Sequence, residues 1–283
     1  MKEYTFTPLN SNHLTGSTTR GTLTKRESYL LSWLAREDRN IFSIDEIRKI
    51  APGDATKIAH SLVQKRWILP LKKGLYAIVP LDVGVEGAEA FIVHDFVTAS
   101  HLAQPYYIGY WSALNFHGLS DQVPRTVFIA TPKAKMPIAI LYSRFYFVKI
   151  ASHKFFGLRE EIVDGGGVLI SDPEKTLVDC LDHPEHSGGI DEVGRAIYFS
   201  HSELDFWRIK EYTLKMKNRT IFKRLGYLLE KIGLLERYPF ILEGVKLSKG
   251  YSKLDPSLPF KGSFSKRWGL MVNAEIDPKR WQY

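Results

Sequence analysis

The clearest pattern of apolar and polar positions lies in residues 54–79, DATKIAHSLVQKRWILPLKKGLYAIV. Ile58, Leu62 and Val63 fall on one stripe of a helix, with the spacing of a face that packs on a core. A second stripe, at i, i+3, i+4 and i+7, carries side chains that can reach phosphates and base edges: Lys57, His60, Ser61 and Gln64. The pattern predicts an amphipathic helix with one polar side facing solvent.

Two short apolar runs follow that helix directly. They cover residues 67–71 and 75–79, and their length and composition are typical of β-strands. Lys72-Lys73-Gly74 joins them, and Gly74 supplies the conformational freedom that a tight turn requires. We therefore expect a hairpin with lysines at its tip. A helix followed by such a hairpin is typical of a winged helix.

Signals for the start of a helix precede this segment. Thr24 is expected to cap a helix over residues 23–36, whose leucines recur at helical spacing. Ser43 and Glu46 form the S-x-x-E capping box of a second, short helix. Asp54 is expected to cap the third helix, its carboxylate accepting from the N–H groups of the first turn. This order of helices and hairpin is that of a winged helix.

The sequence thus predicts an α+β protein with an N-terminal winged helix-turn-helix domain and a larger mixed α/β C-terminal domain. The expected boundaries are a flexible polar arm over 1–22, a DNA-binding domain over 23–80 and the C-terminal domain over 90–283. We assign phosphate contacts to basic residues: Lys57, Lys65, Arg66, Lys72 and Lys73. We assign contacts with base edges to His60, Ser61 and Gln64.

In the C-terminal domain, strand patterns and helix patterns follow one another along the chain. Strands are expected at 126–130, 145–150, 167–170 and 270–273, and helices at 90–103, 112–118, 171–181, 190–200, 204–217 and 221–235. The helix at 171–181 has the strongest start, because Ser171-Asp172-Pro173-Glu174 combines a polar cap, an early proline and an acid in the first turn.

Charge is segregated along the chain, whose net formal charge is +8. Residues 20–80 hold 12 Lys/Arg against 6 Asp/Glu, residues 81–206 hold 9 against 17, and residues 207–283 hold 17 against 7. The basic regions favour phosphate backbones, whereas the acidic middle would repel nucleic acid and suits a basic partner. No apolar stretch is long enough for a membrane span, and the single cysteine fits a reducing cytoplasm, so we expect a cytoplasmic protein.

No pattern in the sequence makes a strong case for catalysis. Cys180, His183 and His186 have spacings that suggest zinc, but a helix end and Pro184 leave their geometry undefined, and no second pair of ligands occurs at a usual spacing. A turn with exposed histidines and a buried thiol is the better interpretation. A metal-dependent nuclease is disfavoured because the glutamate and lysine of residues 172–175 are adjacent. We expect no catalytic residues, metal or cofactor.

Three further motifs, in order, resemble a known family. They are Ser112-Ala113-Leu114 with His117-Gly118-Leu119, Asp172-Pro173-Glu174-Lys175-Thr176-Leu177 with Asp179, and Lys266-Arg267-Trp268-Gly269-Leu270. Following a winged-helix segment that ends in KKGLYAIVP, this succession resembles the AbiEi family, the antitoxins of type IV toxin–antitoxin systems that also act as transcriptional repressors. The resemblance runs from about residue 23 to residue 273, and the shared residues look structural.

The resemblance implies a winged helix that binds inverted repeats in double-stranded promoter DNA, so that the protein represses its own operon. It also implies a C-terminal domain that opposes a cognate nucleotidyltransferase-like toxin, directly or indirectly. We place the toxin-neutralising surface in the basic C-terminal third, at Arg219, Lys223, Arg224, Lys266 and Arg267. The alternatives are a stand-alone winged-helix regulator, whose second domain senses a ligand or oligomerises, and a DNA-processing enzyme.

Overall fold

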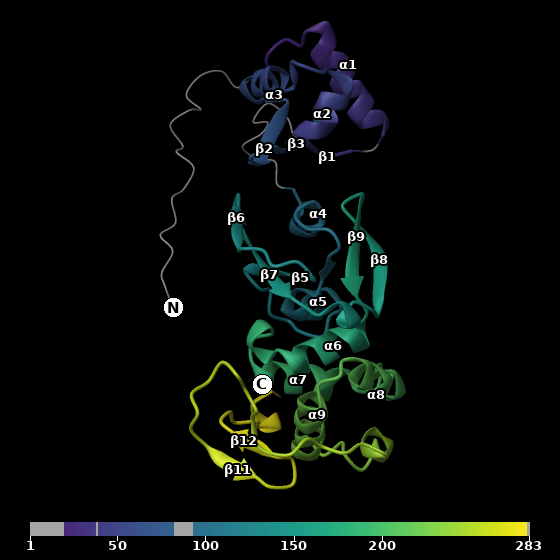
Figure 1. Ribbon diagram of the computed structural model, residues 1–283, viewed down its shortest axis with the longest axis vertical. Coiled ribbons are helices and arrows are strands. Elements are labelled where there is room, and N and C mark those ends of the chain that lie inside the picture. The colour runs from purple at the N-terminus through teal and green to yellow at the C-terminus, as the bar shows by residue number, and fades with distance from the viewer. Residues whose placement is uncertain (1–19, 38, 82–92, 282–283) are drawn as a thin grey trace. The chain divides into compact units, whose positions relative to one another are not determined.

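The computed structural model describes residues 20–37, 39–81 and 93–281 (Figure 1). The chain divides between Val93 and His94 into two compact units, which we call unit 1 and unit 2. Most of the arm expected over 1–22 lies outside the described residues, as do the first residues of the expected C-terminal domain. No helix in the described ranges has the length and apolar character needed to cross a bilayer.

Unit 1 combines three helices with a small antiparallel sheet. Its elements are α1 (Lys25–Arg36), β1 (Ile41–Ser43), α2 (Ile44–Ile50), α3 (Ala55–Gln64), β2 (Ile68–Lys72) and β3 (Leu75–Ile78). The strand order is β1-β3-β2, and both pairings are antiparallel. The helices bury their apolar stripes around Leu30, Ile47 and Leu62, against Phe42 and Ile68 from the strands. Helical spacing in the sequence therefore predicted Leu30, Leu34, Ile58 and Leu62 in the core, while Leu31 and Val63 are only partly buried.

The helix caps of unit 1 confirm two predictions and correct a third. Thr24 and Ser43 each form a capping box, in which their side chains accept from the backbone N–H groups of Glu27 and Glu46. Asp54 precedes α3 but makes no capping hydrogen bond. Its backbone (φ −113°, ψ 2°) is not in the extended conformation from which a cap reaches back over the first turn. Its carboxylate instead accepts a 3.1 Å hydrogen bond from Arg26.

Unit 2 is built on a six-stranded mixed sheet. Its strands are β4 (Tyr107–Ile108), β5 (Thr126–Thr131), β6 (Ile138–Ile140), β7 (Ser143–Lys149), β8 (Leu158–Val163) and β9 (Gly166–Ser171), in the order β6-β7-β5-β4-β9-β8. The pairs β5–β7 and β4–β9 are parallel and the others are antiparallel. The expected strands at 126–130, 145–150 and 167–170 are confirmed. The pattern missed β4 and β6, which are two and three residues long, and also the six-residue β8.

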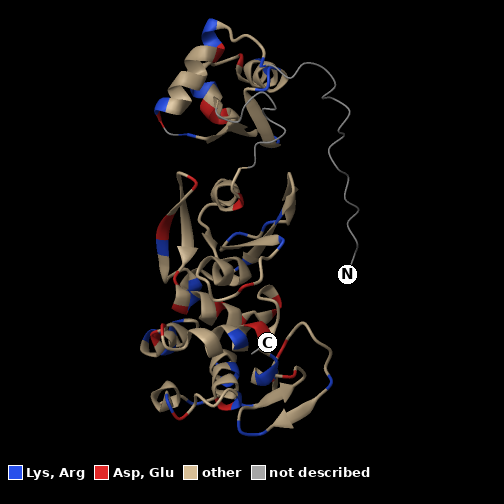
Figure 2. Ribbon diagram, turned by 180° about the vertical axis from the view of Figure 1, so that it is seen from behind, with Lys and Arg blue, Asp and Glu red and all other residues tan. Residues whose placement is uncertain are grey.

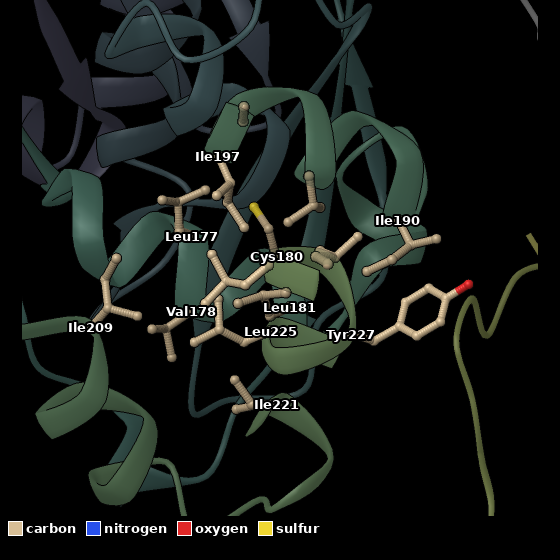
Figure 3. Close-up of a cluster of buried hydrophobic side chains, with 14 of the residues drawn as sticks. Leu177, Val178, Cys180, Leu181, Ile190, Ile197, Ile209, Ile221, Leu225 and Tyr227 are labelled. Atoms are coloured by element: carbon tan, nitrogen blue, oxygen red, sulfur yellow. The ribbon is translucent and has the colours of Figure 1, made fainter. Parts of the chain in front are cut away.

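Helices cover this sheet and supply most of the core of unit 2. They are α4 (Asp95–Ser100), α5 (Tyr110–Phe116), α6 (Pro173–Asp182), α7 (Ile190–Ser200), α8 (Phe206–Lys215) and α9 (Thr220–Lys231), with short 3-10 turns η4 (Ser152–Lys154), η5 (Pro184–His186), η6 (Pro239–Leu242) and η7 (Pro278–Trp281). Among them α6 is central, because it packs against α5, α7, α8 and α9. Figure 3 shows Leu177, Val178 and Leu181 of α6 among side chains of the other helices. The α+β class expected from the sequence is confirmed.

A second, three-stranded sheet lies at the C-terminal end of unit 2. It consists of β10 (Ser252–Lys253), β11 (Ser263–Ser265) and β12 (Leu270–Val272) in the order β10-β12-β11. Trp268, 2% exposed, lies against α9 at Gly226. A Cβ atom at Gly226 would come within 2.0 Å of the indole ring, so only glycine allows this close approach. The C-terminal strands are therefore packed onto the helical core.

Candidate functional site

The solvent-facing side of α3 carries half of the predicted DNA-binding residues. Lys57, His60 and Gln64 are exposed and Ser61 is half-buried. The opposite side of the helix is buried in the core of unit 1 and consists of Ala55, Ile58, Ala59 and Leu62. The structure therefore brings Lys57, His60 and Gln64 together on one accessible face, as a helix that reads a DNA groove requires, whereas Ser61 lies at its edge beside Glu27 of α1.

The hairpin that follows α3 has a tight turn with a lysine at its tip. Gly74 has φ of 77°, the left-handed conformation expected for this position. Lys73 is exposed, and Lys72 is half-buried and pairs with Leu75 across the strands. The carbonyl of Gly74 accepts a 2.9 Å hydrogen bond from the backbone N–H of Ile44. The tip is therefore held against the start of α2, and both lysines have a fixed backbone.

The two basic residues that end α3 differ from the others in their surroundings. The ammonium of Lys65 donates a 2.6 Å hydrogen bond to the carboxylate of Glu27 on α1. The backbone N–H of Gly21 donates to the carbonyl of Lys65, so this end of α3 also holds the chain that leads into α1. Arg66 follows in the left-handed conformation, with φ of 61°. Lys65 thus has a structural role that competes with the predicted phosphate contact.

Glu27 makes the stability of unit 1 depend on pH. Burial disfavours its charged form, but hydrogen bonds from Lys65, Ser61 and Thr24 outweigh burial and lower its pKa from 4.5 to about 2. The lowered pKa means that this stabilisation is present above pH 4.5 and is lost as the pH falls toward 2. We expect Lys65→Met to reduce the free energy of unfolding at pH 7 and to flatten this acid dependence, which amounts to about 3 kcal/mol in the wild type.

Urea unfolding of the full chain between pH 2 and pH 7 measures this effect, with amide exchange of α1 assigning the transition to unit 1. Lys25→Met, which removes an exposed lysine at the start of α1, should match the wild type. If Lys65→Met showed the same acid dependence as the wild type, the assigned role of the Glu27–Lys65 pair would be wrong.

The structure corrects two of the five residues assigned to the toxin-neutralising surface. Lys223 is 0% exposed and Arg224 is 4% exposed. The ammonium of Lys223 donates to the carbonyls of Gly250 and Gly269, and the guanidinium of Arg224 donates to the carbonyls of Leu181, Asp182 and Lys253. Burial lowers the pKa of both side chains. They hold buried backbone carbonyls and offer no surface to a partner.

The other three residues of that assignment are accessible. Arg219, Lys266 and Arg267 are exposed. Figure 2 colours the basic residues along the ribbon of unit 2, and those of α9 include the buried Lys223 and Arg224. Arg267 forms an ion pair with Glu230, whose carboxylate also accepts from the indole N–H of Trp268. Three of the five assigned residues are therefore accessible, with Arg219 at the start of α9 and Arg267 near its end.

Residues of the run 172–179 form a buried network with Tyr107. Lys175 and Asp179 are 0% and 1% exposed and form an ion pair within α6. The hydroxyl of Tyr107 donates a 2.8 Å hydrogen bond to Asp179 and accepts a 3.0 Å hydrogen bond from Lys175. Burial raises the pKa of Asp179 although Lys175 acts in the opposite direction. No pattern in the sequence pointed to Tyr107, which lies 72 residues from Asp179.

The cysteine and the histidines that follow α6 face different surroundings. Cys180 is buried, and Figure 3 shows its sulfur among the apolar side chains of the core. Burial raises the pKa of its thiol well above the usual value, so the thiol stays protonated. His183 and His186 lie instead beside Glu185 in η5. The motif Cys180, His183 and His186 did not include Glu185, whose signal in the sequence is a carboxylate between two histidines in a turn that begins with proline.

The chain thus combines a small unit, which has an exposed polar helix and a basic hairpin, with a larger unit of sheet and helices. Residues 107–231 match the family model of the AbiEi antitoxin C-terminal domain. This part of the chain is similar to AbiEi antitoxin domains, in agreement with the resemblance found in the sequence. The match supports an antitoxin role, and an antitoxin implies a toxin as its partner.

A solved structure resembles nearly the whole chain. The crystal structure of the RV2827C protein from Mycobacterium tuberculosis has a TM-score of 0.64, with 90% of this chain and 93% of that chain covered at 17% identity. At this identity the likeness concerns the fold alone. No curated protein matches the chain.

Proposed function

We propose that this protein is the antitoxin of a type IV toxin–antitoxin system and represses its own operon by binding promoter DNA through unit 1. The observation that carries the proposal is the presence, in one chain, of a segment similar to AbiEi antitoxin domains and a unit with an exposed polar helix beside a basic hairpin. The proposed activities are binding activities and involve no catalysis. The cognate partner would be a nucleotidyltransferase-like toxin.

The order of elements in unit 1 supports the DNA-binding half of the proposal. Helices α1, α2 and α3 followed by β2 and β3, with β1 completing the sheet, are the elements of a winged helix-turn-helix. In that arrangement α3 would enter the major groove, and His60, Ser61 and Gln64 would face base edges. Lys57, Lys72 and Lys73 would contact phosphates, while Lys65 would contribute chiefly by fixing α3 against α1.

A fluorescence anisotropy titration tests this half. The full chain is titrated with a duplex from immediately upstream of its gene and with a scrambled duplex of equal length, over a series of salt concentrations with and without Mg²⁺. We expect tighter binding to the upstream duplex and no cleavage. Equal affinity for both duplexes would overturn specific repression, and Mg²⁺-dependent cleavage would favour a DNA-processing enzyme.

Exposed basic residues of the C-terminal third are the proposed toxin-neutralising surface. We expect Arg219→Glu with Lys266→Glu to abolish rescue of cells that express the neighbouring toxin gene, while leaving DNA binding unchanged, because both side chains are exposed in unit 2. Neither substitution disturbs the pair between Arg267 and Glu230. The measurement is colony survival on toxin co-expression.

The matched control is Lys133→Glu with Lys149→Glu, which makes the same change of charge at exposed positions after β5 and at the end of β7 in unit 2. This control should rescue as well as the wild type. Full rescue by the Arg219 and Lys266 variant would show that the surface lies elsewhere. If the wild type failed to rescue, or no toxin gene lay beside this one, a stand-alone regulator would be favoured.

A further inference from the structure

Three potential metal ligands gather in the turn between α6 and α7. His183, Glu185 and His186 each offer one donor atom, and these atoms all lie within 4.8 Å of one another. The Nδ1 atom of His183 is 2.9 Å from a carboxylate oxygen of Glu185. The two imidazole rings are stacked, with centroids 5.7 Å apart and an interplanar angle of 27°. Two imidazoles and a carboxylate therefore converge from four consecutive residues.

The backbone of this turn is held by its own hydrogen bonds. Pro184 opens η5, and the N–H of His186 donates a 3.0 Å hydrogen bond to the carbonyl of His183. The N–H of Ser187 donates a 2.9 Å hydrogen bond to the carbonyl of Pro184. A tight turn of this kind places side chains at i and i+3 on the same side, which explains why both histidines face Glu185.

An outer carboxylate orients His183. The Nε2 atom of this imidazole is 3.5 Å from Asp182, a residue that is 6% exposed. Lys154 and Asn218 donate hydrogen bonds of 2.5 Å and 2.6 Å to the two oxygens of Asp182, so this carboxylate has a fixed position. A carboxylate beside one nitrogen of an imidazole whose other nitrogen faces a ligand is the arrangement found around histidines that bind metals. This leaves Nδ1 of His183 as the ligating atom.

Aromatic side chains hold His186 in place. Its ring centroid is 5.2 Å from that of Tyr146, 5.5 Å from that of Tyr110 and 5.7 Å from that of Phe128. Within the part of the chain that the structure describes, no hydrogen bond engages either of its ring nitrogens. An imidazole that is oriented by packing and keeps a nitrogen available is suited to bind a metal ion.

We propose that His183, Glu185 and His186 bind one divalent transition-metal ion of the Zn²⁺ class, with water completing its coordination. Imidazole nitrogens favour zinc, cobalt or nickel over magnesium and calcium, which prefer oxygen ligands. Bonds of about 2.0–2.1 Å place the ligands of a tetrahedral ion roughly 3.3 Å apart. The donor atoms therefore close in on the ion by a small movement, which the exposed Glu185 can make. The bound ion would tie the end of α6 to the start of α7.

The test uses the untagged full chain after treatment with a chelator. Zn²⁺ is added in a calorimetric titration, and Co²⁺ is followed by visible absorption, which reports the coordination number. We expect one ion per chain and a spectrum of low-coordinate Co²⁺, with weaker binding of Mg²⁺ and Ca²⁺. Absence of stoichiometric Zn²⁺ binding would overturn the proposal, and so would equal competition by Ca²⁺.

Variants assign the bound ion to these residues. Glu185→Gln should weaken Zn²⁺ binding at least about tenfold, and His183→Gln with His186→Gln should abolish it. His101→Gln removes an exposed histidine elsewhere in unit 2 and should bind as the wild type does. Glu185 is exposed, so its variant keeps the fold, which circular dichroism verifies. Undiminished binding by both the Glu185 variant and the histidine double variant would place the ion elsewhere and refute the site.

Discussion

Replacing Lys72 and Lys73 together by alanine is expected to weaken binding to every duplex by about 30-fold at 0.15 M salt. The physical reason is counterion release: each phosphate contact frees close to one condensed cation and contributes about fivefold at this concentration. The slope of log affinity against log salt should also become shallower by about 2. The preference for the upstream duplex over a scrambled one should remain, because these lysines lie in the hairpin and not on the polar face of α3.

The matched control replaces Lys25 and Arg36, which are exposed at the two ends of α1, and removes the same charge from unit 1. Its affinity should fall much less, since only the general attraction between a basic unit and DNA is reduced. Equal losses for both double variants would mean that the net charge of unit 1 acts and the hairpin has no contact of its own. Anisotropy titrations of the full chain over the salt series distinguish the two results.

Asp179→Asn is expected to lower the free energy of unfolding of unit 2 by about 3–5 kcal/mol. Asparagine has nearly the shape of aspartate, so no cavity forms, but the ammonium of Lys175 loses its partner while remaining 0% exposed. A buried charge without a partner is far less favourable than the same charge in a pair. Urea unfolding of the full chain measures the loss, with amide exchange of α6 assigning the transition to unit 2.

A second substitution separates the effect of charge from that of packing. The double variant Lys175→Met with Asp179→Asn removes the buried ammonium as well as the carboxylate. It should regain most of the free energy of unfolding lost in Asp179→Asn, because a buried ion pair contributes little more than apolar side chains of similar volume. The raised pKa of Asp179 agrees with this expectation, since burial opposes its charged form. A double variant as unstable as Asp179→Asn would show that hydrogen-bond geometry around Tyr107, and not charge, dominates.

Local signals in the sequence predicted what neighbouring residues decide. The capping boxes at Thr24 and Ser43, the left-handed Gly74 and the start of α6 at Asp172 each depend on residues within four positions, and each is confirmed. Asp54 does not cap α3: its backbone is not extended, and its carboxylate accepts a hydrogen bond from Arg26 of another helix instead. Short-range rules do not include such a competitor.

The candidate surfaces show the same limit. The polar face of α3 follows from helical spacing alone, and the structure places it in solvent. The burial of Lys223 and Arg224 could not be predicted, because the carbonyls that they hold come from residues 181–182 and from residues 250–269. Counting charges along the chain treats every cation as solvated. Lys223 and Arg224 are buried because the C-terminal segment packs against α9, and this contact is not visible in the sequence.

The packing on α9 also shows how far along the chain the folded C-terminal domain extends. The family match stops at residue 231, but a fragment cut there would lose Trp268 from its seat at Gly226 and the two glycine carbonyls that hold Lys223. The apolar surface of α9 that Trp268 covers would then be exposed to water. We therefore expect a fragment of this domain to fold only if it continues through β12. Fragments that end at residue 231 should aggregate on expression.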